Sequence, residues 1–458
     1  MQIKLLFAAL AAAILAACGG GGSGTSPLPA ADTTVQVNLG DGPADRLLAV
    51  GLTVDAMSLV DANGRAVPVL SSPRSMEVMH LMGTARPMAI AQVPQGAYTA
   101  AAMTFGTATV TYIDAAGQPV QRRVPGPMTA NVSLTPALTV GSTPMVVNLD
   151  MNMAASIAIG SDGGVSMTPV MTARMNPPVP GSHDPEDGGM HGLSGVASAV
   201  SAGAFTLTML QGMPGLSLAT GPGTQFMGMT GMGMMANGML LTVDASRQPN
   251  GTWIAERVHS RMGGGAMVAG VVTSLTGSPP TQLALVMHDG AGGGMLASNL
   301  AGTATIQIDS TTVFEIDTDG VDLNSLPFTP RFDRSTVTRG QRVEALSSSP
   351  MMQGGGMGGM VGGGTLTATL LRLEQQALRG TVSGYSASGS QATFMFALPV
   401  DSAFARLTGV SVVPVYRQAG TQLRGLTSVG DGATVVVRGL LFFDGSAFRL
   451  VAARIVGT

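Results

Sequence analysis

Cysteine is almost absent from this chain of 458 residues, because Cys18 is the only one. A single thiol cannot form an intramolecular disulfide, so disulfides cannot hold the fold together. Aromatic residues make up only 4% of the chain. The cores must therefore be filled by Val, Leu, Ile, Ala and the flexible side chain of Met.

Charge is scarce as well. Charged residues make up 11% of the chain, against about a quarter in an ordinary globular protein. The net charge is −3, and Lys4 is the only lysine, so every later cation is an arginine. Nucleic-acid binding is typically marked by a basic patch, and the sequence shows none. We therefore expect no nucleic-acid partner.

The first 17 residues have the pattern of an export signal. Lys4 precedes the uncharged apolar run from residue 5 to residue 17, which is too short for the about 20 residues that span a bilayer. The tetrad Leu15-Ala16-Ala17-Cys18 resembles a lipobox. This resemblance implies cleavage after Ala17 and acylation of Cys18. The alternative is an ordinary secretory signal with a chance cysteine near its end.

Residues 18–31 read as a lipidated flexible tether, because Gly and Ser dominate the segment after Cys18. The resemblance implies a bacterial cell-envelope protein bound to a membrane through this lipid. By resemblance to the sorting of enterobacterial lipoproteins, Gly19 rather than Asp after Cys18 implies the outer membrane. An envelope glycan or an envelope protein is the expected partner of the domains that follow.

Residues 32–177 are predicted to form a β-sandwich domain. The segments 35–39 and 52–56 alternate apolar and polar residues, which is the period of half-buried strands. Turn residues at 61–64 and 94–98 separate short strands, and 146–151 and 165–170 are expected to close the sheets. The fold class is thus all-β.

Three segments of this domain resemble the family called domain of unknown function 4382. They are Leu39-Gly40-Asp41-Gly42-Pro43-Ala44-Asp45, Pro94-Gln95-Gly96-Ala97-Tyr98-Thr99, and Ser156 with Thr168-Pro169-Val170. Members of that family typically follow a lipobox in surface lipoproteins, and they have no settled activity. The resemblance supports a fold and a location.

A linker is expected at residues 178–191, since prolines are followed by a charged, Gly-rich stretch. His183, Asp184, Glu186, Asp187 and His191 of this linker carry metal-ligating groups. A linker seldom preorganises a metal site, so a solvated hinge is the favoured interpretation.

The rest of the chain reads as three repeats, which open at Gly195, Gly270 and Gly380. Each opening is followed by a turn, an apolar strand and, later, a Gly-led pair of strands. We assign the repeats to residues 192–262, 266–376 and 377–458, the second with a Met/Gly-rich insertion. Units of this length are typical of small β-barrels. They resemble domain of unknown function 5666, which implies OB-like barrels, and the third repeat shows the pattern best.

Methionine is the most unusual feature, with 32 residues in the chain. Thioether sulfur favours Cu(I) when it lies in exposed Gly-rich loops. The copper candidates are Met227, Met229, Met232, Met234 and Met235. The alternative interpretation is a low-complexity loop, together with methionine as an adaptable core residue. We favour this alternative and predict no required cofactor.

Signatures of enzymes are mostly missing from the sequence. It contains no G-x-S-x-G, H-E-x-x-H or P-loop motif. The loop 317–324 is rich in oxygen ligands, but it lacks the ligand order of a calcium-binding EF-hand loop, so a solvated turn is favoured. The sequence predicts a non-catalytic binding or structural protein of the cell envelope, with a copper-binding protein as the alternative.

Overall fold

The structure is a computed structural model that describes residues 31–457, apart from Pro43, Pro350 and the segments 210–214, 262–264, 292–299 and 353–363. The described residues form thirty β-strands and two short α-helices, so the all-β prediction is confirmed. None of the described helices is long and apolar enough to cross a membrane.

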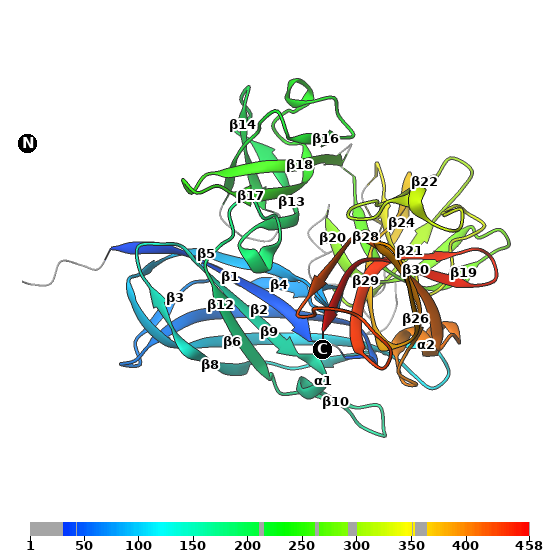
Figure 1. The fold of residues 1–458 in the computed structure, drawn as a ribbon, viewed down its shortest axis with the longest axis horizontal. Coiled ribbons are helices and arrows are strands. Elements are labelled where there is room, and N and C mark those ends of the chain that lie inside the picture. Colours follow the sequence, from blue (N-terminus) through cyan, green and yellow to red (C-terminus); the bar gives the residue numbers. More distant parts are fainter. Residues whose placement is uncertain are drawn as a thin grey trace, which may run out of the picture.

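The N-terminal unit is a sandwich of two sheets (Figure 1). In the first sheet the order is β12-β9-β1-β5, and β1 pairs in parallel with β9. In the second sheet β2 and β6 are the long central strands, and β3, β4, β7 and β8 pair with them. The strands are β1 (Asp32–Gly42), β2 (Leu47–Asp61), β3 (Ala66–Pro68), β4 (Arg74–Glu77), β5 (Ala85–Pro94), β6 (Gly96–Ile113), β7 (Pro119–Val124), β8 (Met128–Val140), β9 (Met145–Asn152) and β12 (Met171–Asn176).

Methionine fills much of the core of this sandwich. Met57, Met76, Met88, Met103 and Met151 are all at most 2% exposed. A flexible thioether fits the irregular gaps that a core poor in aromatic rings leaves. Of the segment 165–170, predicted as a closing strand, residues 165–167 form a strand, but it joins neither sheet of the sandwich. β11 (Val165–Met167) instead forms a separate hairpin with β10 (Ile157–Ile159), after the helix α1 (Met153–Ser156).

The next unit is a five-stranded barrel. Its ring order is β13-β14-β15-β18-β17, closed by the parallel contact of Ala219 in β15 with Ile254 in β18. The strands are β13 (Met190–Ser198), β14 (Ala204–Met209), β15 (Leu216–Ala219), β17 (Leu240–Arg247) and β18 (Trp253–Arg261), and the short β16 (Gln225–Met227) pairs with β18.

The middle unit has the same strand order, but its fifth strand is interrupted. β24 pairs with the third strand, β21, whereas β25 pairs with the fourth strand, β23, and only Ala368 and Thr369 separate β24 from β25. The sheet is therefore seven-stranded and not a simple closed ring. Its strands are β19 (Met267–Thr276), β20 (Gln282–Ala291), β21 (Thr303–Gln307), β22 (Val313–Ile316), β23 (Arg342–Leu346), β24 (Thr365–Thr367) and β25 (Leu370–Leu373).

The last unit is a second closed barrel, in the order β26-β27-β28-β30-β29. The short helix α2 (Ala403–Thr408) lies between its second and third strands. Ser402 caps this helix by accepting a hydrogen bond from the backbone of Ala405. The strands are β26 (Gln376–Ser388), β27 (Gln391–Ala397), β28 (Val412–Arg424), β29 (Thr434–Phe443) and β30 (Phe448–Gly457). Both closed barrels have the strand order of an OB-fold.

The segment expected to be a solvated hinge is instead packed against two units. It forms the 3₁₀ turn η2 (Pro185–Asp187), whose Pro185 carbonyl accepts hydrogen bonds from the side chains of Gln36 and Asn38 in β1. Asp184 pairs with Arg424 and Arg454 of the last barrel at 2.7 and 2.6 Å. The sequence could not show these partners, because they lie about 150 to 270 positions away in the chain.

The units also share apolar contacts. Leu48 and Ile113 of the sandwich, Val271 and Val286 of the middle unit, and Leu407 of α2 belong to one buried cluster. Figure 1 shows the first barrel above the sandwich and the other two units beside it. The sandwich, the middle unit and the last barrel therefore share this buried cluster.

Candidate functional site

A cavity of about 610 Å³ lies where the four units meet. The sandwich contributes the turn around His80 and the start of β5, and the first barrel contributes β13, β17 and β18. The middle unit contributes β19, β22, β23 and β25, and the last barrel contributes Arg438. A volume of this size is within the range of cavities that hold small organic ligands.

Charged residues are concentrated in this cavity, although they are rare in the chain. Five arginines and seven acidic residues line it, together with three of the five histidines. The lining charged residues are Arg86, Arg257, Arg342, Arg372, Arg438, Asp244, Asp289, Glu315, Asp317, Asp319, Glu344 and Glu374, and the histidines are His80, His191 and His259. Buried charges are unfavourable unless they are paired, so each of them needs a partner.

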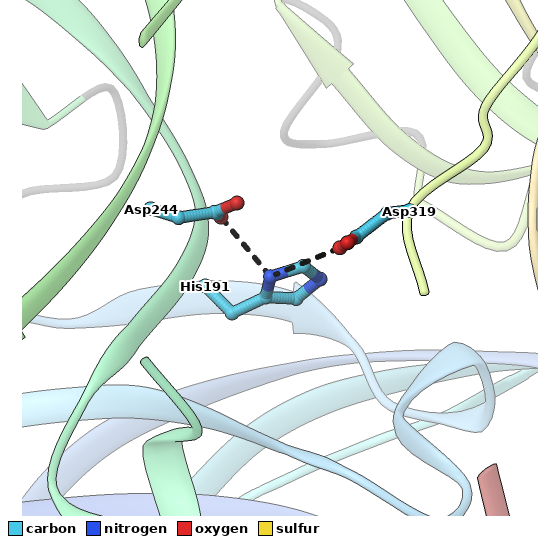
Figure 2. Close-up of side chains that lie close together, drawn as sticks. All are labelled: His191, Asp244 and Asp319. Atoms are coloured by element: carbon cyan, nitrogen blue, oxygen red, sulfur yellow. Dashed lines mark ion pairs between the residues drawn. The ribbon is translucent and has the colours of Figure 1, made fainter. Parts of the chain in front are cut away.

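One end of the cavity is an ion-pair network between the first barrel and the middle unit. Figure 2 shows His191 between the carboxylates of Asp244 and Asp319, with Nδ1 3.0 Å from Asp244 and 4.0 Å from Asp319. Arg257 contacts the same two carboxylates at 3.0 and 2.7 Å. The three metal-ligating groups lie within 4.8 Å of one another. Because Arg257 and a protonated His191 together balance the two carboxylates, we interpret the group as an ion-pair network.

The pKa values at this end follow from the pairing. Burial by itself would raise the pKa of Asp244, but His191 and Arg257 hold it at about 2. Burial by itself would lower the pKa of His191, but Asp244 and Asp319 keep it above its ordinary value. Burial and the neighbouring Asp319 raise the pKa of Asp317. A charged His191 facing an ionised Asp244 is therefore the favoured state.

A row of acidic residues forms the next part of the wall. Glu315, Asp317 and Asp319 alternate along and just beyond β22, and all three line the cavity. Alternate residues of an extended segment point to the same face, which explains their common orientation. Arg372 of β25 pairs with Glu315 at 2.9 Å and also contacts the ring of His259.

Two other arginines of the wall, Arg342 and Arg438, make no direct contact with a carboxylate in the described part of the chain. Arg342 donates to the carbonyl of Gln375, and Arg438 donates to the carbonyl of His80. Burial, with Arg342 and Arg454 nearby, lowers the pKa of Arg438 to about 9. The charges of Glu374 and Asp317 act on Arg438 without direct contact, so its guanidinium group keeps donors that no carboxylate occupies.

A buried histidine pair lies beside these arginines. The ring of His80 is 6.1 Å from that of His288, measured between centroids. Nδ1 of His80 is 2.8 Å from the carboxylate of Glu77, which also accepts the backbone N–H groups of Val50, Met79 and His80. Burial, together with Arg86 and Arg342, holds the pKa of His80 well below its usual value, so its ring is neutral.

The predicted copper ligands do not share one environment. Met229 and Met235 are each 7% exposed and belong to the core of the first barrel. Met232 packs partly against the same core, whereas Met227 and Met234 are 45% and 55% exposed. Met227 is the one of the five that lines the cavity. The predicted lipidation site, Cys18, lies outside the described residues.

Sequence reasoning missed most of this site. The loop 317–324 was favoured as a solvated turn, yet Asp317 and Asp319 face the cavity, and Asp319 pairs with Arg257. A signal was present in the sequence, because charges are so scarce that an alternating Glu315, Asp317 and Asp319 stands out. The arginines gave no signal, since they come from all four units.

The comparisons with known proteins support the barrel assignment. The family model described as domain of unknown function 5666 matches residues 194–259, which is most of the first barrel. The sequence had indicated the third repeat as the best representative, and this is corrected: the matched repeat is the first. No curated protein matches the chain.

Several solved structures align with the chain at low similarity. The wild-type single-stranded DNA binding protein from Thermus aquaticus is 12% identical, with a TM-score of 0.16, over 42% of this chain and 91% of that one. A multidomain protein with nucleic acid binding domains from Streptococcus pneumoniae TIGR4 is 8% identical, with a TM-score of 0.11, over 57% of this chain and 72% of that one.

These findings correct the predicted partners. The sequence excluded nucleic acid and predicted a membrane anchor with an envelope glycan or protein partner. The aligned structures are instead named for nucleic-acid binding, and the comparisons show neither an anchor nor an envelope partner. The exclusion rested on the lack of a basic patch in the sequence, whereas the alignment follows backbone shape. At these TM-scores the likeness assigns no ligand to the chain.

Proposed function

We propose that this is a non-catalytic binding protein that takes one small organic anion into the cavity between its four units. The observation that carries the proposal is the pair Arg342 and Arg438, two cavity-lining arginines without a carboxylate partner. The other arginines of the wall have such partners, which join the units. The unpaired guanidinium groups are then available to a carboxylate or phosphate group.

Binding fits this site better than catalysis. Arg86 lies 2.8 Å from Asp289 and keeps the pKa of that carboxyl below its usual range. Asp244 is held ionised in the same way by His191 and Arg257. Carboxylates that are locked in ion pairs position other groups, but they are poor proton donors or acceptors near neutral pH.

A titration of the full-length protein with small carboxylates and phosphate monoesters tests the proposal. Calorimetry on wild type should give one site, and Arg342→Gln or Arg438→Gln should weaken binding about 10- to 100-fold, because each removes a charge-assisted hydrogen bond. Arg331→Gln is the control, since Arg331 is exposed and pairs only with Asp333. No anion binding, or equal binding by all three variants, would contradict the proposal.

We also propose three properties that rest on the sequence alone. They are a bacterial cell-envelope location, inferred from the export-type segment 1–17, the resemblance of the sandwich to domain of unknown function 4382, and the acylation of Cys18. The copper alternative also stays a prediction. It gains no support from the methionines, because two of the five are buried in a barrel core.

A further inference from the structure

A smaller pocket of about 90 Å³ adjoins the cavity. His80 and Arg342 line both spaces, and His288 lines the smaller one. The pocket lies between the sandwich, the middle unit and α2 of the last barrel. The two spaces therefore adjoin at His80 and Arg342.

Three buried polar atoms of residues that line this pocket lack a hydrogen-bond partner among the described residues: Nε2 of His80, Nδ1 of His288 and Nε of Arg342. Their residues are 8%, 5% and 9% exposed, respectively. An unsatisfied buried polar atom costs about 1–3 kcal/mol, so three such atoms on residues that line one pocket indicate an occupant.

The protonation state of each histidine follows from its other nitrogen. Burial raises the pKa of Glu77 to about 7. Above that pH Glu77 is ionised, Nδ1 of His80 donates to its carboxylate, and Nε2 is left as an acceptor. Nε2 of His288 lies 3.0 Å from the carbonyl of Leu48, so it donates, and Nδ1 is left as an acceptor. Burial and Arg342 lower the pKa of His288 to about 3, so its ring is neutral too.

The pocket thus presents two acceptors and one cationic donor, which restricts the occupant. A metal cation would suit the imidazoles, but it would be repelled by Arg342 and Arg438. A bare anion would suit Arg342 but would face two lone pairs. A hydroxyl group can donate to an imidazole nitrogen and accept from the Nε–H of Arg342 at the same time.

We propose that the ligand is a hydroxylated organic anion, whose hydroxyl groups bind His80 and His288 in the small pocket while its carboxylate or phosphate binds Arg342 and Arg438. This inference rests on the proposed function and names the ligand class for that site. Glu77 is a positioning residue, because it holds the tautomer of His80 and does not reach the ligand.

Three six-carbon probes separate the two ideas: gluconate has a carboxylate and hydroxyls, hexanoate has only the carboxylate, and glucitol has only hydroxyls. On the full-length protein we expect gluconate to bind at least 10-fold more tightly than either of the others. Glycerol 3-phosphate against inorganic phosphate repeats the comparison for a phosphate group. Equal affinity for gluconate and hexanoate would overturn the hydroxyl inference and leave anion binding standing.

The variants His80→Phe and His288→Phe remove the acceptors and keep a planar ring. Each should weaken gluconate about 10-fold or more and leave hexanoate within about twofold, whereas Arg438→Gln should weaken both. Should these variants fail to fold, ¹⁵N shifts of the histidine rings in wild type decide, because gluconate should move Nε2 of His80 and Nδ1 of His288. Unmoved ring nitrogens would mean that water alone fills the pocket, and no binding of any probe would overturn both proposals.

Discussion

At the scale of single residues, the chain uses its few charges in short-range pairs that lie between units. Asp244 on β17 has His191 and Arg257 as partners, and Arg257 reaches on to Asp319 of the middle unit. The Asp244 side chain is 10% exposed, so solvent screens these interactions only weakly. Such pairs should make the stability of the protein depend on pH.

The variant Asp244→Asn tests this dependence. The pKa of Asp244 is lowered in the folded state, so its contribution is present above its ordinary pKa of 3.8 and is lost as the pH falls through about 2. The pKa of His191 is raised, so its contribution is present below 6.5 and is lost as the pH rises through the raised value.

The free energy of unfolding of wild type should therefore exceed that of Asp244→Asn by about 2 kcal/mol between pH 4 and 6.5. The difference should shrink toward pH 2 and, in part, above neutrality, where the pairing with Arg257 persists. Urea unfolding at pH 2.5, 5.5 and 8 measures it. A difference that is the same at all three values would contradict the assignment of these pairs.

At the scale of elements, the glycine that opens each repeat has a steric reason. Gly195, Gly270 and Gly380 lie on the first strand of their units. A Cβ atom there would lie 2.6, 2.1 and 2.6 Å from a carbonyl oxygen of the second strand. The glycine recurs in the sequence because the same close contact between the first two strands occurs in all three units.

Replacing any of these glycines by alanine should destabilise the protein. Because the obstructing atom is backbone, the two strands must separate, and we expect a loss of about 1–3 kcal/mol in the free energy of unfolding. Gly203→Ala is the matched control, since no atom lies within 4 Å of its Cβ position. Chemical denaturation of the four variants measures the effect, and Gly270→Ala behaving like Gly203→Ala would refute the steric explanation.

At the scale of the whole molecule, the segment 178–189 connects the sandwich to the last barrel through hydrogen bonds and ion pairs. Asp184 is 6% exposed and is held ionised by Arg424 and Arg454 of the last barrel, which keep its pKa below the usual range despite burial. Gln36 and Asn38 bind the same segment from the sandwich. A connection that joins the first and last units should couple their unfolding.

Asp184→Asn should break this coupling. Removing one charge from a buried cluster typically costs about 3–5 kcal/mol, because the remaining charges lose their partner. We expect faster hydrogen exchange in the segment around η2 and along β30, and thermal unfolding in two steps instead of one. Asp401→Asn is the control, since Asp401 is 49% exposed and lies 3.9 Å from Arg46. Unchanged exchange in Asp184→Asn would show that the segment does not hold the units together.

The sequence by itself determined the strands, because the alternation of apolar and polar residues and the turn glycines are local properties. It also determined the three repeats, whose opening glycines report a contact within each unit. The export signal at residues 1–17 and the lipid site at Cys18 stay predictions of the sequence. Only the tertiary structure decided the site, since Arg342, Arg438 and His80 come from three units and meet only when those units dock. The seven-stranded middle sheet likewise depends on non-local pairing that no local pattern encodes.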